Sequence, residues 1–275
     1  MNKIFDTHCH PHLNKIKNID ETIKSFFEKW WNYMTIIWTD LEKSKEVLEL
    51  ANKYEWVFAS IGIHPCDIDN LDLEKVILGL ENLLLKNKNK IVAIWECWLD
   101  YYWMERDEKT NLLDEVNRNK VINLKKKLQE IFFIAQINLA KEYKLPVIIH
   151  NRESKDDVLR ILKQTNFKNF ILHCYSEDLK YAKELIEFAP NCKISFSWLI
   201  TFKNTIDIQE TVKNIDIKHI LAETDSPYLT PIPFRWKEEN EPIFTKYIID
   251  KINDIRWENC SEQIFNNSLE IFKIT

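Results

Sequence analysis

The chain has 275 residues, of which 45% are hydrophobic and 29% are charged, and its formal net charge is −5. This size and composition are typical of an ordinary globular protein with one barrel-sized domain or two smaller ones. The negative charge argues against a broadly basic nucleic-acid surface, and the absence of a long apolar run argues against a signal peptide or a membrane span, so we expect a cytoplasmic protein.

Eight short apolar runs, rich in β-branched residues, recur along the chain. They occupy residues 3–8, 33–40, 57–65, 90–100, 146–152, 169–176, 192–199 and 219–227. Buried parallel strands have this composition because both of their faces are covered. Segments with apolar residues three and four positions apart, such as 41–54, 129–143 and 177–189, lie between the runs and are typical of helices. The alternation predicts an α/β fold, a single (β/α)₈ TIM barrel over residues 1–275.

One connection is longer than a barrel requires. Residues 104–127 follow the fourth predicted strand, and they are charged and only weakly periodic. A segment that follows a barrel strand lies on the side of the barrel that carries active sites. We interpret it as a solvated insertion, with a mobile lid as the alternative.

Polar residues gather at the C-terminal ends of the predicted strands, where barrel enzymes place their chemistry. His8 and His10 form an H-x-H pair, and the two-residue period of a strand turns both imidazoles to one face. Later strands end near further residues of this kind, namely His64, Glu96, His150, His173 and Asp225. The barrel therefore gathers histidines and carboxylates around one axis.

This set predicts a site for two divalent cations. Neutral imidazole and carboxylate suit zinc and manganese, while magnesium is equally compatible with hydrolytic chemistry. Burying so many ionisable groups at one point without a cation would be costly. Two other histidines are not expected to bind metal. His12 lies beyond Pro11, which should end the strand, so we expect it on the surface or behind the ligands. His219 begins its strand at the other end of the barrel, where we expect a structural role.

Six motifs in order carry a family resemblance: DTHCH, GIHP, ECWLDYYW, PVIIHNR, HCYS and ETDSPYL. Together they are similar to the TatD family of metal-dependent deoxyribonucleases in the amidohydrolase superfamily, from Lys3 to about Phe272. The resemblance implies hydrolysis of DNA phosphodiester bonds, commonly from the 3′ end of single strands, with two or more divalent ions. The sequence leaves the choice between DNA and RNA open, and we expect a monomer.

The resemblance also implies residue roles. One ion would be held by His8, His10, Glu96 and Asp225, and the second by Glu96, His150 and His173, so that Glu96 is the bridge. Asp225 is the candidate general base. Four residues are candidates for phosphate contact because each can donate a hydrogen bond: His64, Tyr101, Arg152 and Arg235.

Two other functions remain open. The same ions polarise carbonyl groups, so the chain could be an amide or ester hydrolase, for example an aminoacyl-tRNA deacylase. Glu96 stands where many amidohydrolases have a carboxylated lysine, which favours the TatD branch over small cyclic amides. The third reading is a metal-binding barrel without turnover, in which Trp98 and Trp198 block the site.

The tryptophan content requires an explanation, because the chain holds ten Trp and only two Gly. Average usage predicts on the order of 19 glycines in this length. Similar proteins have glycine at the positions of Trp38, Trp95, Trp98, Trp198 and Trp236, and a turn glycine would be unsurprising at Trp30, Trp56 and Trp257. Our hypothesis is that the source reads the UGA codon as glycine and that this sequence was translated with a table that reads UGA as tryptophan.

Glycine is used for positive φ or for close backbone approach, and indole is barred from both. The hypothesis therefore predicts that several of these eight tryptophans are crowded, off rotamer or at positive φ. The competing hypothesis is that they are real and reshape the site for base stacking, as aromatic residues do in single-strand binders.

Overall fold

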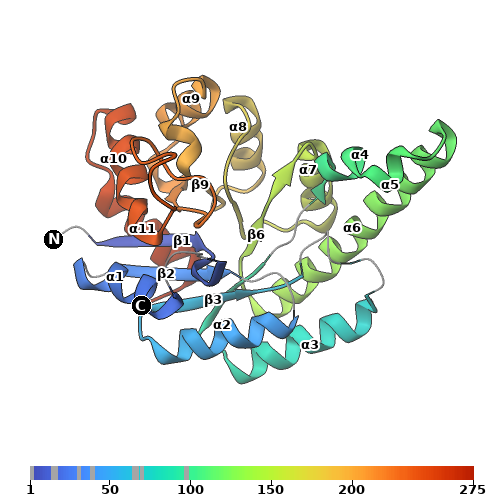
Figure 1. Cartoon of the computed structure of the whole chain (residues 1–275), viewed down its shortest axis with the longest axis horizontal. Coiled ribbons are helices and arrows are strands. Elements are labelled where there is room, and N and C mark those ends of the chain that lie inside the picture. Colours follow the sequence, from blue (N-terminus) through green and yellow to red (C-terminus); the bar gives the residue numbers. More distant parts are fainter. Residues whose placement is uncertain are drawn as a thin grey trace.

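The computed structural model describes residues 3–13, 18–29, 32–37, 41–63, 68, 71–95 and 99–275 (Figure 1). Within these ranges eight parallel strands form one sheet in the order β1-β2-β3-β4-β6-β8-β9-β10. The strands are β1 (Ile4–Cys9), β2 (Asn32–Ile37), β3 (Val57–Ile61), β4 (Ile91–Ile94), β6 (Val147–Ile149), β8 (Phe170–Leu172), β9 (Lys193–Phe196) and β10 (Ile220–Ala222). Each apolar run of the sequence supplies one of them, so the predicted (β/α)₈ barrel is confirmed.

The first and last strands nearly close the barrel. A parallel β-bridge joins Cys9 to Ser226, and the backbone N–H of His10 donates to the carbonyl of Ser226 at 2.7 Å. The N–H of Asp225 donates to the carbonyl of His8 at 2.9 Å. The C-terminal ends of β1 and β10, far apart in the chain, are therefore adjacent in space.

Helices cover the outside of this sheet in Figure 1. They are α1 (Ile19–Lys29), α2 (Leu41–Lys53), α3 (Leu73–Lys86), α6 (Glu115–Tyr143), α7 (Lys155–Thr165), α8 (Leu179–Phe188), α9 (Ile206–Asn214), α10 (Thr245–Arg256) and α11 (Ser261–Phe272). Phe5 at the start of β1 packs on Phe272 of α11, with ring centres 5.4 Å apart, so α11 covers the barrel end opposite the strand C-termini. Among the described residues no helix is long and apolar enough to span a membrane.

The long segment after the fourth barrel strand is helical. It contains α4 (Tyr102–Arg106), α5 (Glu108–Asn111) and the first part of α6. The side chain of Asp114 caps α6 by accepting from the N–H of Asn117, so this helix begins well before the predicted segment 129–143. In Figure 1, α5 and the start of α6 extend away from the barrel. Leu112 is 87% exposed there. An exposed helix end needs no apolar face, so the sequence shows only weak helical periodicity in this segment.

Two short strands outside the barrel sheet fix the start of this segment. They are β5 (Leu99–Asp100) and β7 (Asn151–Arg152), which pair in parallel. The backbone N–H of Tyr101 also donates to the carbonyl of Arg152 at 3.2 Å. The pair therefore ties the chain that leaves β4 to the chain that leaves β6.

The backbone φ angles test part of the prediction about the suspect tryptophans. Trp236 has φ of 67° and Trp257 has φ of 56°, in the left-handed region that favours glycine. For these two of the five suspect tryptophans that the structure describes, the prediction of positive φ is confirmed. Trp56 is half-buried beside the ring of Tyr33 and has an ordinary φ. Trp30, Trp38 and Trp98 lie outside the described residues.

Trp257 gives a direct stability test. It is the left-handed residue that ends α10, and its side chain is 92% exposed, so little packing offsets the backbone strain. We expect Trp257→Gly to raise the free energy of unfolding by about 1 kcal/mol. Urea titration of this variant and of Trp257→Ala, which removes the indole but keeps Cβ, measures the effect. Equal stability of the two variants would show that φ at this position is of no consequence.

Candidate metal centre

Two histidines and a carboxylate meet at the ends of β1 and β10. The Nε2 atoms of His8 and His10 are 3.0 Å apart, and the Oδ1 atom of Asp225 lies 3.5 Å from the first and 3.7 Å from the second. Ligand atoms that bind one ion at about 2.1 Å in tetrahedral geometry lie about 3.4 Å apart. These three side chains are therefore close to the spacing that a single cation requires. They are also largely withdrawn from water, with side-chain exposures of 1%, 6% and 15%.

Hydrogen bonds fix which nitrogen of His10 is available. Its Nδ1 atom lies 3.1 Å from the carbonyl oxygen of Ile37, which can only accept, so Nδ1 carries the proton. Nε2 then presents its lone pair toward His8 and Asp225. A ligating histidine commonly has its other nitrogen bonded in this way.

A second pair of histidines adjoins the first. The Nδ1 atom of His150 and the Nε2 atom of His173 are 2.9 Å apart, at the ends of β6 and β8. The rings of His8 and His173 are stacked, with centres 4.0 Å apart. The structure thus brings together five of the six predicted ligands. Glu96, the predicted bridge, lies outside the described residues.

Sequence reasoning missed Glu223, a buried carboxylate in the same cluster. Its Oε1 atom accepts from Nδ1 of His173 at 3.0 Å and from the backbone N–H of Cys174 at 2.6 Å. Because Nδ1 of His173 donates to this carboxylate, its Nε2 atom is left with a lone pair. Glu223 stands two positions before Asp225, and this i, i+2 spacing was the signal that could have revealed it. His8, His173 and Glu223 also form a trio whose ligand atoms lie within 4.8 Å of one another.

Asp6 braces the two segments that carry His8 and Asp225. Its carboxylate accepts from the backbone N–H of His8 at 3.2 Å, from that of Thr224 at 3.0 Å and from the Thr224 hydroxyl at 2.6 Å. Burial raises the pKa of Asp6 to about 8, against the effect of these donors. Asp225 itself has φ of 54°, a conformation that places its carboxylate beside the histidines at the cost of backbone strain.

The donor set fits a divalent cation. Burial, followed by the neighbouring histidines, lowers the pKa of His8 well below its usual value, so this imidazole is neutral, as a ligand must be. Its Nδ1 atom is buried and has no hydrogen-bond partner in the part of the chain that the structure describes. Nδ1 can carry the proton of the neutral ring, which leaves the lone pair on Nε2, the atom that faces His10 and Asp225.

Trp95 crowds this cluster. Its side chain is fully buried, and its ring centre lies 4.0 Å from that of His8 and 4.8 Å from that of His173, edge-on to both. Its indole N–H is buried without a partner among the described residues, and the same holds for Trp198. The backbone is also tight here, because a Cβ on Gly62 would lie 1.2 Å from the carbonyl oxygen of Trp95. The predicted crowding is confirmed at Trp95.

The other candidate site residues are more scattered. The hydroxyl of Tyr101 donates to Asp157 at 2.8 Å, so its hydrogen is already used in this bond. The guanidinium of Arg235 lies over the ring of Phe202 at 4.1 Å. His64 and the side chain of His12 lie outside the described residues.

Arg152 and His219 lie at opposite ends of the barrel. Arg152 ends β7, two residues after His150, and its guanidinium stacks on the ring of Tyr102 at 3.7 Å. The ring of His219, by contrast, is buried before β10 with Nδ1 bonded to the carbonyl of Cys192 at 2.8 Å, which confirms its structural role.

The fold and the site together define an eight-stranded parallel barrel that carries a candidate metal centre of histidines and carboxylates at its strand ends. The sequence profile described as "TatD related DNase" matches residues 5–273, and the chain belongs to this family. The chain is 32% identical to the uncharacterized metal-dependent hydrolase YabD of Bacillus subtilis, over 98% of this chain and 99% of that protein. It is 33% identical to a protein of the same description, MG009 of Mycoplasma genitalium, over 98% of each chain.

A solved structure agrees with the fold. The crystal structure of YJJV, a TatD homolog from Escherichia coli, superposes with a TM-score of 0.82 over 99% of this chain and 98% of that chain, at 21% identity. At this identity the likeness supports the barrel architecture and not the activity.

Proposed function

We propose that the chain is a metal-dependent hydrolase that cleaves DNA phosphodiester bonds, acting as a 3′-5′ exodeoxyribonuclease on single strands. The observation that carries the proposal is the trio of His8, His10 and Asp225 beside the His150 and His173 pair, in a barrel of the TatD related DNase family. The relatives named as metal-dependent hydrolases support the same class of chemistry.

Two ions are proposed, with the residue sets implied by the family resemblance. His8, His10, Glu96 and Asp225 would hold one, and Glu96, His150 and His173 the other. Divalent cations at such sites, when bound, lower the pKa of a water and neutralise charge on the phosphate. Glu223 holds the His173 ring in the orientation that turns Nε2 toward the site.

The remaining steps belong to the chain itself. Asp225 takes the proton of the attacking water, for which its carboxylate is placed within 3.7 Å of both histidines of the trio. Arg152 and Arg235 supply guanidinium groups for the phosphate oxygens. Tyr101, with its hydroxyl held by Asp157, fits better as support for the wall of the site than as a phosphate donor.

One observation favours a barrel without turnover. With indole at position 95, the space beside His8 and His173 is filled. The nuclease and the barrel without turnover differ in the effect expected of glycine at the suspect positions. Glycine restores activity if the tryptophans are artefacts of the code. It leaves the protein inactive if the site has no turnover.

The test is release of nucleotides from 3′-labelled single-stranded DNA with manganese or magnesium. We expect the version with glycine at all eight suspect positions to digest DNA and the chelator EDTA to stop the reaction. The chain with tryptophan serves as the comparison. If both folded proteins bind metal and leave DNA intact, the nuclease proposal fails, and ester and amide substrates such as aminoacyl-tRNA become the ones to assay.

A further inference from the structure

Tyr102 lies between two arginines. The guanidinium carbons of Arg106 and Arg152 are each 3.7 Å from the centre of its ring. Two flat cations cannot share one face of a ring at this distance, so they lie on opposite faces. Their separation is then close to twice the distance from each to the ring. We call this arrangement the Arg106–Tyr102–Arg152 stack.

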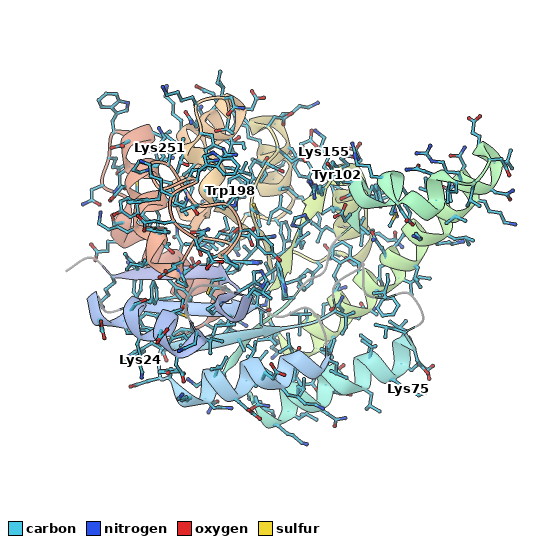
Figure 2. All side chains as sticks on the ribbon, viewed as in Figure 1. Lys24, Lys75, Tyr102, Lys155, Trp198 and Lys251 are labelled. Atoms are coloured by element: carbon cyan, nitrogen blue, oxygen red, sulfur yellow. The ribbon has the colours of Figure 1, made fainter. Side chains whose placement is uncertain are left out.

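The stack is fixed to the barrel close to the candidate metal centre. Arg152 follows His150 by two residues, and pairing of Asp100 with Arg152 in the β5–β7 ladder sets its backbone. Tyr102 begins α4 directly after this ladder, and Arg106 lies one helical turn later, where its Nη1 atom donates to the carbonyl of Tyr102 at 3.0 Å. Figure 2 labels Tyr102 on α4 and Lys155 at the start of α7.

Stacking on the ring uses the faces of the two guanidinium groups and not their edges. The N–H donors of a stacked guanidinium point outward in its own plane, where they can meet the oxygens of a phosphate. Arg106 has a carboxylate nearby, that of Glu153 at 3.5 Å, and both side chains are about half exposed. An exposed pair at this distance is weak and exchanges readily with a phosphate.

We propose that the Arg106–Tyr102–Arg152 stack binds two backbone phosphates of a single-stranded nucleic acid next to the phosphodiester bond that is cut. Tyr102 is a positioning residue, which holds the two guanidinium groups apart at a set spacing. Neither Tyr102 nor Arg106 belongs to the candidate metal ligands or to the residues of the proposed hydrolysis, so these two contribute to strand binding, while Arg152 is shared with the proposed function. The proposal rests on the proposed function for the identity of the substrate.

Binding without metal tests the stack apart from catalysis. In EDTA, the anisotropy of a fluorescein-labelled single-stranded DNA of twelve nucleotides reports affinity at several salt concentrations. We expect Arg106→Gln and Tyr102→Ala to weaken binding about fivefold and to reduce the salt slope by about 0.7 for each phosphate that the variant no longer binds. Tyr102→Phe keeps the ring and should bind like the parent chain. Lys120→Gln removes an exposed charge from the first part of α6 and is the matched control.

A second substrate separates this proposal from the proposed function. Bis(4-nitrophenyl) phosphate has one phosphodiester and no neighbouring phosphates. Arg106→Gln, made in the version with glycine at the eight suspect positions, should therefore hydrolyse it with unchanged kcat while its KM for the oligonucleotide rises. If no protein hydrolyses either substrate but the stack variants still lose strand affinity, the proposed function fails and the stack stands. If affinity and salt slope equal those of the Lys120→Gln control, or if the parent chain does not bind the strand, the stack proposal is overturned.

Discussion

Trp95→Gly is expected to bind manganese about tenfold or more tightly than the chain with tryptophan, and to be at least as stable. The indole lies edge-on to His8 and His173 and fills the space next to their rings. Its removal frees that volume for an ion and its water ligands. Isothermal titration with manganese measures the affinity, and urea unfolding measures the stability.

The stability of this variant separates the two explanations for the tryptophan. Removing a large aromatic side chain from an evolved core costs about 3–5 kcal/mol. Phe133 is 1% exposed in the core, and Phe133→Ala is the matched control for that cost. If Trp95→Gly is destabilised like Phe133→Ala and gains no manganese affinity, indole belongs at this position and the recoding hypothesis is wrong.

Direct sequencing gives an independent check. Cleavage after Lys90 and Arg106 releases a peptide of residues 91–106, which holds Trp95, Trp98 and Trp103. In protein isolated from its source, we expect glycine at the first two positions and tryptophan at the third. Mass spectrometry of this one peptide therefore carries its own control, since Trp103 is not among the suspect residues.

Asp225→Asn is expected to lower kcat for DNA hydrolysis by about 10³-fold or more, because the change removes both a charged ligand and the proposed base. His8→Asn should abolish metal binding instead, since His8 belongs to both trios of candidate ligands. These effects are measured on the glycine version by nucleotide release and by manganese titration. A thermal shift gives a second readout: manganese should raise the Tm of the parent and leave that of His8→Asn unchanged.

His219→Asn is the control for the loss of a buried histidine. This residue is 2% exposed at the other end of the barrel, where its ring bonds to the carbonyl of Cys192. We expect its variant to retain manganese affinity and hydrolysis. Loss of activity equal to that of His8→Asn would point to general damage to the barrel rather than to a metal centre.

The barrel and most of the candidate site could be predicted because their signals are local. Apolar runs mark the strands, and the two-residue period that places His8 beside His10 needs no knowledge of distant contacts. Glu223 escaped notice because its role depends on His173, a partner from another strand. Glu223 and Asp225 lie two positions apart in the same motif. This spacing alone does not tell a carboxylate that would bind metal from a carboxylate that orients a histidine.

Two other features depend on tertiary structure. The first half of α6 extends from the barrel, so no apolar periodicity marked it as helix. The Arg106–Tyr102–Arg152 stack arises from the β5–β7 pair, whose strands have two residues each and leave no pattern in the sequence. Side chains that meet only because short strands pair are beyond prediction from one sequence.

The joining of β1 to β10 has a consequence for protein synthesis. Asp6 and Thr224, which brace the candidate ligands His8 and Asp225, are 218 positions apart in the chain. At ordinary rates of translation, a ribosome needs roughly ten to forty seconds to cover that distance. Throughout that interval the first two histidines have no carboxylate partner from β10. The candidate centre is therefore assembled late, only after β10 and the residues that follow it have been synthesised.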